Sequence, residues 1–321
     1  DCPGFHDPVI KQLEGPVASA DLAFDADGSL IGSNTFDIFR SSYDGPAQLW
    51  VPGMEGRAAT RFLPDGRLTY TQENLNRVML VDQEGNTSVL AAGLNYPFGL
   101  AVDQQGTVYI ADQDRILRVH PDDLELQVWL DFVPGQARWL AFDAEYESLF
   151  IGGTTRHIYR AFLNQDGSSQ GAEWFGSLQL LLANDWPSDS DSGGTAATTD
   201  PWDSGSEPPG GSAEGGLTAG SDTGTGDPGF EEALVDGIGV DECGNVYVAE
   251  FFSSALYMIP SWGGEGEALV DWDEVEYGHG LEWGSGIGGW SETALYLPQP
   301  YNDNSVIEVE IGVTSRPRVF P

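Results

Sequence analysis

Hydrophobic residues along this chain come in short runs, rich in β-branched and aromatic side chains, that are separated by turns containing Gly, Asp and Asn. The clearest example is LAVDQQGTVYIAD at residues 100–112, with an apolar stretch, a turn at Gly106 and a second apolar stretch. Runs of this length bounded by turn residues predict β-strands joined as hairpins. No segment shows the period of an amphipathic helix, so the pattern predicts an all-β protein.

The same unit recurs along the chain. Successive units start 38, 40, 40, 98 and 43 residues apart, at Leu22, Thr60, Leu100, Leu140, Ile238 and Leu281. Further apolar runs follow in these units, for example at residues 76–82, 87–93, 115–120, 157–163 and 305–311. A repeat of about 40 residues that holds four short strands is typical of one propeller blade. The sequence therefore predicts a six-bladed β-propeller with four-stranded blades.

An additional strand precedes the first unit. Residues 9–14 have the character of a fourth strand and lie before the first of the six units. We expect this N-terminal strand to complete the last blade and to close the ring, because closure removes an exposed sheet edge.

The one long spacing contains an insertion. Residues 187–229 consist mainly of Ser, Gly, Thr, Asp and Pro and contain no Lys or Arg. Such a composition buries too little apolar surface to fold alone. We therefore expect one propeller domain, residues 1–321, with a disordered insertion between blades 4 and 5. The insertion is a solvated loop or, alternatively, a lid or a cation-gathering fringe.

The charge balance restricts the partners. Asp and Glu number 51 against 13 Lys and Arg, a net charge of −38. Such a surface repels phosphate backbones and anionic lipid, which argues against nucleic acid and acidic membranes as partners. No apolar run is long enough to span a membrane. The two cysteines, Cys2 and Cys243, form one disulfide in an oxidising compartment or remain as two thiols. We expect a monomer located outside the cell or in the periplasm or cell envelope.

The segment DGIGVDECGNVYVAEF at residues 236–251 resembles the signature of NHL-repeat propellers and of the regucalcin/gluconolactonase family, within the strictosidine-synthase-like clan. The resemblance implies a calcium ion on the ring axis. In the hydrolase members, Glu, Asn and Asp side chains hold this ion from positions two residues before the first apolar residue of each innermost strand. Some members add a His in the last blade.

The corresponding positions here are Ala20, Ala58, Phe98, Arg138, Asp236 and His279. Only Asp236 and His279 match the family pattern. Arg138 would place a positive charge where the family holds a divalent cation, and like charges at close range repel strongly in a channel of low dielectric. An ion pair between Arg138 and Asp236 would satisfy both groups without a metal. We therefore expect no cofactor, with Ca²⁺ on Asp236 and His279 as the alternative.

The second strand of each unit returns to the same face. Asp112 and Glu250 are expected near this rim, as are Asn34 and Gln72 in neighbouring blades. With Arg138, Trp139 and Phe98, they would line a mouth that suits a small molecule or a protein segment.

Three functions remain open. The first is binding of a small ligand or protein partner at this mouth. The second is a lactonase or esterase of the regucalcin/gluconolactonase type, in which His279 is the general base and Asp236 orients it or a metal. The third is a structural interaction module with a sealed channel. No G-x-S-x-G, C-x-x-C, H-E-x-x-H or P-loop motif points to another chemistry.

Overall fold

The computed structural model describes residues 2–34, 36–43, 45–54, 59–180, 233–271 and 278–315. These residues belong to one compact unit formed by residues 1–181 and 231–321. The predicted insertion at residues 187–229 lies outside the described residues. Within the described part, the regular structure is all β-strand except for one short 3₁₀ turn, Glu73–Leu75. Also within this part, no helix has the length and apolarity needed to cross a membrane.

Four antiparallel sheets contain four strands each, as the repeat predicts. The first comprises β2 (Leu22–Phe24), β3 (Leu30–Ser33), β4 (Ile38–Ser41) and β5 (Gln48–Val51). The second comprises β6 (Thr60–Phe62), β7 (Leu68–Gln72), β8 (Arg77–Val81) and β9 (Thr87–Ala92). The third comprises β10 (Pro97–Val102), β11 (Val108–Asp112), β12 (Arg115–Val119) and β13 (Gln127–Leu130). The fourth comprises β22 (Glu282–Trp283), β23 (Ala294–Gln299), β24 (Ser305–Glu310) and β1 (Val9–Leu13).

A fifth sheet has eight strands. One half comprises β14 (Ala137–Phe142), β15 (Ser148–Gly153), β16 (His157–Leu163) and β17 (Ser169–Leu178). The other half comprises β18 (Val235–Val240), β19 (Val246–Glu250), β20 (Ala255–Ile259) and β21 (Gly264–Asp271). The outer strands β17 and β21 join the halves through a short parallel pairing that begins at Gly176 and Gly264. A side chain at Gly176 would collide with the backbone of Gly264, so glycine permits this close approach.

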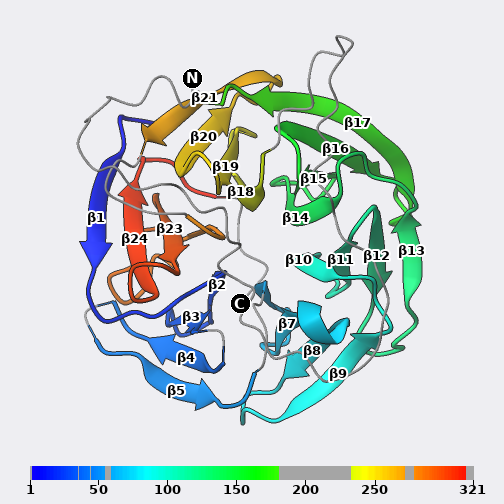
Figure 1. The fold of residues 1–321 in the computed structure, drawn as a ribbon, viewed down its shortest axis with the longest axis horizontal. Helices are drawn as coiled ribbons and strands as arrows, with labels where there is room; N and C mark the ends of the chain where they lie inside the picture. The colour runs from blue at the N-terminus through cyan, green and yellow to red at the C-terminus, as the bar shows by residue number, and fades with distance from the viewer. Residues whose placement is uncertain are drawn as a thin grey trace, which may run out of the picture. The chain divides into compact units, whose positions relative to one another are not determined.

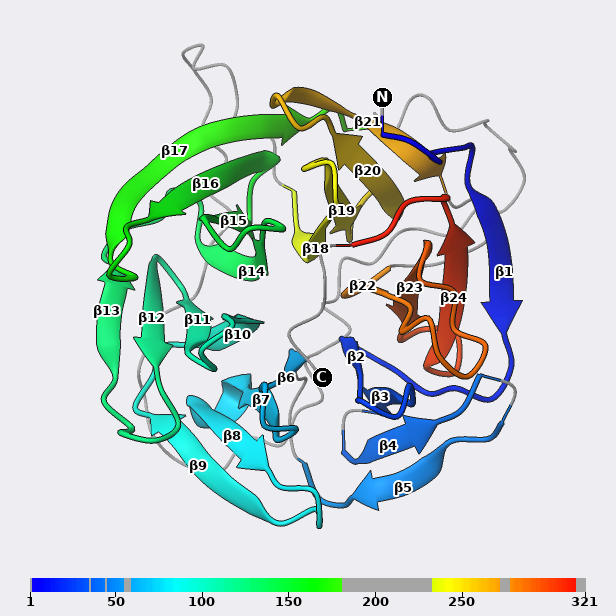
Figure 2. The ribbon, with the colours of Figure 1, turned by 180° about the vertical axis from the view of Figure 1, so that it is seen from behind.

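The sheets follow one another around a common axis, with β2, β6, β10, β14, β18 and β22 innermost (Figure 1, Figure 2). This arrangement is that of a propeller, as predicted. The innermost strands β10, β14 and β18 are buried along nearly their whole length, whereas the outermost strand β1 is mostly exposed. The apolar core therefore lies between neighbouring sheets, and the axis is left to the residues at and near the ends of the innermost strands.

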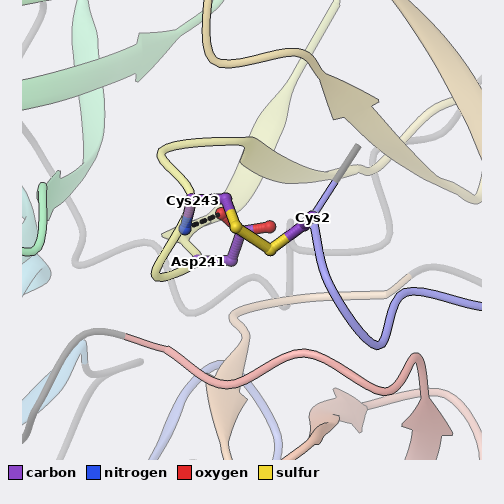
Figure 3. A group of neighbouring side chains, drawn as sticks. All are labelled: Cys2, Asp241 and Cys243. Carbon is purple, nitrogen blue, oxygen red and sulfur yellow. Dashed lines mark hydrogen bonds between the residues drawn. A yellow bond between two sulfur atoms is a disulfide. The ribbon is translucent and has the colours of Figure 1, made fainter.

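The N-terminal strand completes the last sheet, as predicted. Strand β1 pairs with β24 from Val9 opposite Glu310 to Leu13 opposite Val306. The segment before β1 is also held covalently, because Cys2 and Cys243 form a disulfide (Figure 3). Of the two alternatives for the cysteines, the structure shows the bonded one. The bond links the N-terminus to the turn between β18 and β19.

A repeated turn explains the Asp-x-x-Gly pattern in the sequence. Asp103 accepts backbone hydrogen bonds from Gln105 and Thr107 at 2.9 and 2.8 Å, and Gly106 closes the turn with φ of +87°. Such a positive φ strongly favours glycine. Asp25 and Asp241 form the same turn in two other sheets. The Asp-x-x-Gly pattern therefore reflects the geometry of the turn that joins each of these innermost strands to the second strand of its hairpin.

Candidate functional site

Three innermost strands begin with the same irregularity. The pairing register shifts between Pro97 and Leu100 in β10, between Ala137 and Trp139 in β14, and between Val235 and Gly237 in β18. A bulge leaves the extra residue outside the ladder and redirects its side chain. The residues outside the ladder include Phe98, Arg138 and Asp236, which are three of the positions singled out from the sequence.

Arg138 and Asp236 form a buried ion pair. The Nη2 and Nε atoms of Arg138 donate to the same oxygen, Oδ1 of Asp236, at 2.7 and 3.2 Å. The Arg138 side chain is 16% exposed and that of Asp236 is 1% exposed. Arg138 therefore neutralises the Asp236 carboxylate directly, in the ion pair considered from the sequence.

Aromatic rings enclose the pair. The Arg138 guanidinium carbon lies 3.8 Å from the ring centre of Phe98, a cation–π contact. Phe98 in turn meets the buried Trp139 edge to face at 5.7 Å. The Trp139 indole Nε1 donates a third hydrogen bond to Asp236 Oδ1 at 3.3 Å. The sequence-predicted residues 98, 138, 139 and 236 are thus brought together.

His279 completes the cluster from the last sheet. Its Nδ1 atom lies 3.1 Å from Oδ2 of Asp236, so the imidazole faces the carboxylate. The backbone anchors it, since the His279 amide donates to Pro298 and the Gly280 amide donates to the carbonyl of Asp236. Phe251 packs edge to face on the imidazole at 5.0 Å. The ring is almost fully buried, with Nδ1 directed at the carboxylate.

The neighbours of Asp236 control its ionisation. Burial raises the pKa of this carboxyl, but the charges of Arg138 and His279 and the hydrogen bonds from Arg138 and Trp139 lower it more strongly. The pKa of Asp236 therefore lies below its ordinary value, and the residue is ionised at neutral pH.

The axial position does not fit a divalent cation. A calcium ion needs six or more oxygen ligands. Here the guanidinium of Arg138 already contacts the Asp236 carboxylate, and Ala20 and Phe98 stand at two other ligand positions of the family. Ala58 lies outside the described residues. The residues present therefore offer a positive charge and too few ligands for this metal.

A second group of possible metal ligands consists of Cys2, Asp241 and Cys243. The sulfur atoms of the two cysteines are bonded to each other, and Asp241 caps its own turn by accepting the amide of Cys243 (Figure 3). Metal binding by cysteine requires thiolates, so this group serves the turn and the disulfide.

The two rim carboxylates, Asp112 and Glu250, are buried in local contacts. Asp112 binds Arg115 through Oδ2 at 2.8 and 2.9 Å, and its Oδ1 accepts the amide of Asn95. Glu250 accepts amide hydrogen bonds from both flanking loops, including those of Leu234 and Ser253. These bonds hold the loops at the mouth, and ligand binding by Asp112 and Glu250 stays a prediction.

Asn34 and Gln72 play a similar part at the same face. The Asn34 side chain accepts the amides of residues 36 and 37, and Gln72 accepts a hydrogen bond from Arg77 at 2.6 Å. Polar residues at or just after the ends of second strands therefore anchor the loops in four sheets.

Sequence reasoning did not single out a second buried ion pair near the axis. Asp21 is fully buried, accepts the Thr60 amide at 2.9 Å and contacts Arg61 Nη1 at 2.5 Å. Burial raises the pKa of Asp21 to about 6, although Arg61 lowers it. Alignment of the six repeats contains the signal, because Asp21 occupies a place that is Ala or Gly in four of the other five units.

No protein-family model matches the chain, and no curated protein matches its sequence. Solved structures do match. A gluconolactonase from Xanthomonas campestris has a TM-score of 0.65 at 14% identity, covering 94% of this chain and 89% of its own. A catalytically inactive His-to-Ala variant of virginiamycin B lyase from Staphylococcus aureus, with quinupristin, has a TM-score of 0.56 at 11% identity, covering 95% and 100%.

An auxiliary nutrient binding protein from Bacteroides thetaiotaomicron has a TM-score of 0.62 at 9% identity, covering 93% of this chain and 70% of its own. At such identities the likeness shows the fold. It confirms the predicted resemblance: the chain has the propeller fold of regucalcin and gluconolactonase type.

Proposed function

We propose that this protein hydrolyses a lactone or another ester at the mouth of its ring. The observation that carries the proposal is the contact of one buried carboxylate, Asp236, with both His279 and Arg138. A carboxylate that orients an imidazole is the arrangement by which His serves as a general base. The similar solved structures support a hydrolytic role for His279, since one is a gluconolactonase and another is a lyase inactivated by the loss of a His.

The roles follow from the geometry. With Nδ1 of His279 facing Asp236, we assign Nε2 of the neutral imidazole to accept a proton from a water that enters with the ester, because Nε2 is enclosed in this structure. The oxygen of this water attacks the carbonyl carbon of the ester. The ester C–O bond then breaks, and His279 returns the proton to the departing alkoxide, giving a carboxylic acid and an alcohol. We assign Arg138 to the carbonyl oxygen, because a guanidinium can donate to a developing negative charge while still bound to Asp236.

We also propose that the ring has six blades. The two halves of the eight-stranded sheet each contain four strands in the order of a single blade, and their junction covers only three residues of each strand. Counting the halves as separate blades gives a six-bladed ring, with the mouth at the start of the innermost strands.

Ligand binding without catalysis is a second candidate. Apolar side chains are exposed in loops at the same ends of four sheets: Phe36 (67%), Tyr96 (46%), Phe132 (62%) and Phe252 (58%). Exposed aromatic residues on several loops favour contact with a partner or ligand. The similar structure from Bacteroides thetaiotaomicron is an auxiliary nutrient binding protein, which agrees with this role. A sealed structural module is the case in which neither turnover nor binding occurs.

We propose an extracellular, periplasmic or envelope location for a monomer. The disulfide between Cys2 and Cys243 supports this location, because such bonds persist in oxidising compartments. The ligand in this setting is a small molecule or protein segment, and the net charge of −38 argues against nucleic acid.

Turnover of sugar lactones, alkyl lactones and aryl esters tests the proposal, measured with EDTA and with added calcium. We expect activity that survives EDTA and falls about 100-fold or more in His279→Gln, within the range typical of general-base catalysis. His120→Gln is the matched control, because His120 binds the Gln105 carbonyl outside the cluster. Turnover that survives His279→Gln would overturn the proposal. Saturable lactone binding without turnover would establish the second candidate instead.

A further inference from the structure

A separate cavity lies farther along the axis. It has a volume of about 90 Å³ and is lined by the later residues of the six innermost strands, together with Tyr146 and Ser315. The lining begins three or more residues beyond the start of strands such as β10 and β14, where Phe98 and Arg138 lie. The lining residues Leu140 and Ile238 lie two residues beyond Arg138 and Asp236, so at about 3.3 Å per residue the cavity is roughly 7 Å along the strands from the His279 cluster. One water needs roughly 10–15 Å³, so the cavity has room for more than one.

Small residues create this space. One position in the repeat, the residue after the first apolar residue of each unit, lines the cavity in all six strands. Four strands have Ala or Gly there: Ala23, Ala101, Ala141 and Gly239. The other two carry charges, Arg61 and Glu282. The cavity is therefore a ring of small side chains interrupted by one cation and one anion.

The two charges are not equally compensated. Arg61 contacts the buried carboxylate of Asp21 at 2.5 Å and also donates to the Thr60 carbonyl. In the described part of the chain, Glu282 accepts the amide of Trp283 and takes part in no ion pair, and its charge helps to raise the pKa of the nearby Asp21. Among the described residues, the charge at the cavity without an ion-pair partner is thus the negative charge of Glu282.

Aromatic side chains line the same space. Phe24, Phe62, Tyr146 and Trp283 all contribute to the walls, with aliphatic residues between them. Aromatic faces attract cations, and the attraction is strengthened where water is partly excluded. The net charge of −38 also raises the local concentration of cations around the protein.

We propose that this cavity binds a small organic cation of the ammonium class, with Glu282 as the counter-charge and the aromatic walls around the alkyl groups. The site is independent of the His279 cluster and of the proposed hydrolysis. The opposite occupant, a small carboxylate on Arg61, would have to compete with the bonded Asp21.

Calorimetric titration with tetramethylammonium chloride tests the proposal, with sodium chloride at the same ionic strength as the reference. We expect saturable binding of one ion per chain. Glu282→Gln should weaken it at least tenfold, because it removes the charge and keeps the shape. Glu267→Gln, at an exposed position of the outer strand β21, is the matched control and should leave binding unchanged.

Ala141→Leu gives a second test, since it adds bulk to the cavity wall without altering any charge. It should abolish binding in protein whose melting curve shows that it is folded. Binding that survives both Glu282→Gln and Ala141→Leu, or no saturable binding to the wild type, would overturn the proposal. Saturable binding of acetate that depends on Arg61 in place of tetramethylammonium would also overturn it.

Discussion

Arg138 donates two hydrogen bonds to a single oxygen of Asp236, although the two residues are 98 positions apart in the sequence. Bulges in β14 and β18 place both side chains outside the strand ladder. Because the pair is largely buried, removal of one partner leaves a charge without compensation, which costs more than the pair itself contributes. Removing one partner should therefore destabilise the protein more than removing both.

Replacing Arg138 by Leu should lower the free energy of unfolding by about 3–5 kcal/mol, the usual cost of breaking a buried pair. Urea unfolding measures the loss. The double variant Arg138→Leu/Asp236→Asn should recover part of it, since the orphaned charge is then absent. Arg67→Leu is the control: Arg67 binds Asp65 at 2.7 Å on the surface, where such pairs contribute about 0–1 kcal/mol. Equal losses in Arg138→Leu and Arg67→Leu would contradict the prediction.

The buried pair of Asp21 and Arg61 predicts a pH effect. Burial raises the pKa of Asp21 from 3.8 to about 6 against the lowering effect of Arg61. Between these values the folded protein holds a proton that the unfolded chain has lost. The contribution of Asp21 to the free energy of unfolding is therefore full below pH 4, falls as the pH rises to 6 and is constant above, a change of about 3 kcal/mol.

The difference in stability between the wild type and Asp21→Asn, measured by urea unfolding from pH 4 to pH 7, isolates this effect. The stability of the wild type relative to Asp21→Asn should decrease as the pH rises. The stability of the wild type relative to Asp65→Asn should show the opposite pH dependence. Hydrogen bonds and charge from Arg67 lower the pKa of Asp65 despite partial burial, so its contribution is lost as the pH falls. A flat difference for Asp21→Asn would refute the prediction.

Much of the architecture follows from the sequence because the hairpin unit repeats. The third strand predicted at residues 157–163 is β16, His157–Leu163, and the closing strand predicted at residues 9–14 is β1, Val9–Leu13. The joining of two four-strand sets through β17 and β21 was not predictable. It depends on the close approach of Gly176 and Gly264, which no periodicity encodes.

The site was predictable where the repeat fixes the direction of a side chain. Arg138 and Asp236 occupy the same position in two units, so their meeting at the axis follows from alignment alone. The contact of Phe251 with His279 does not, because Phe251 belongs to a loop whose path the repeat leaves open. Asp112 and Glu250 lie at strand ends as expected, but nearby backbone amides and Arg115 satisfy their carboxylates.

The disulfide predicts sensitivity to reduction. Cys2 and Cys243 are 241 positions apart, and the bond ties the chain start to the turn between β18 and β19. Loss of a native disulfide typically costs about 2–5 kcal/mol. Reduction should therefore lower the melting temperature of the wild type, and Cys2→Ser/Cys243→Ser should melt at the same lower temperature with or without reductant. An unchanged melting temperature after complete reduction would refute this role.

Removal of the closing strand should cost more than removal of the disulfide alone. Residues 9–13 of β1 pair with residues 306–310 of β24. Leu13 is also buried in the apolar cluster that contains Trp290 and Tyr296. A chain lacking residues 1–14 loses both the bond and the strand, whereas Cys2→Ser/Cys243→Ser loses only the bond. The truncated chain also exposes the edge of β24, and exposed edges pair with other chains. We therefore expect the truncated protein to unfold at lower urea than the double Ser variant and to elute as larger species in size-exclusion chromatography. If the two proteins unfolded together and both eluted as monomers, β1 would not be the element that closes the ring.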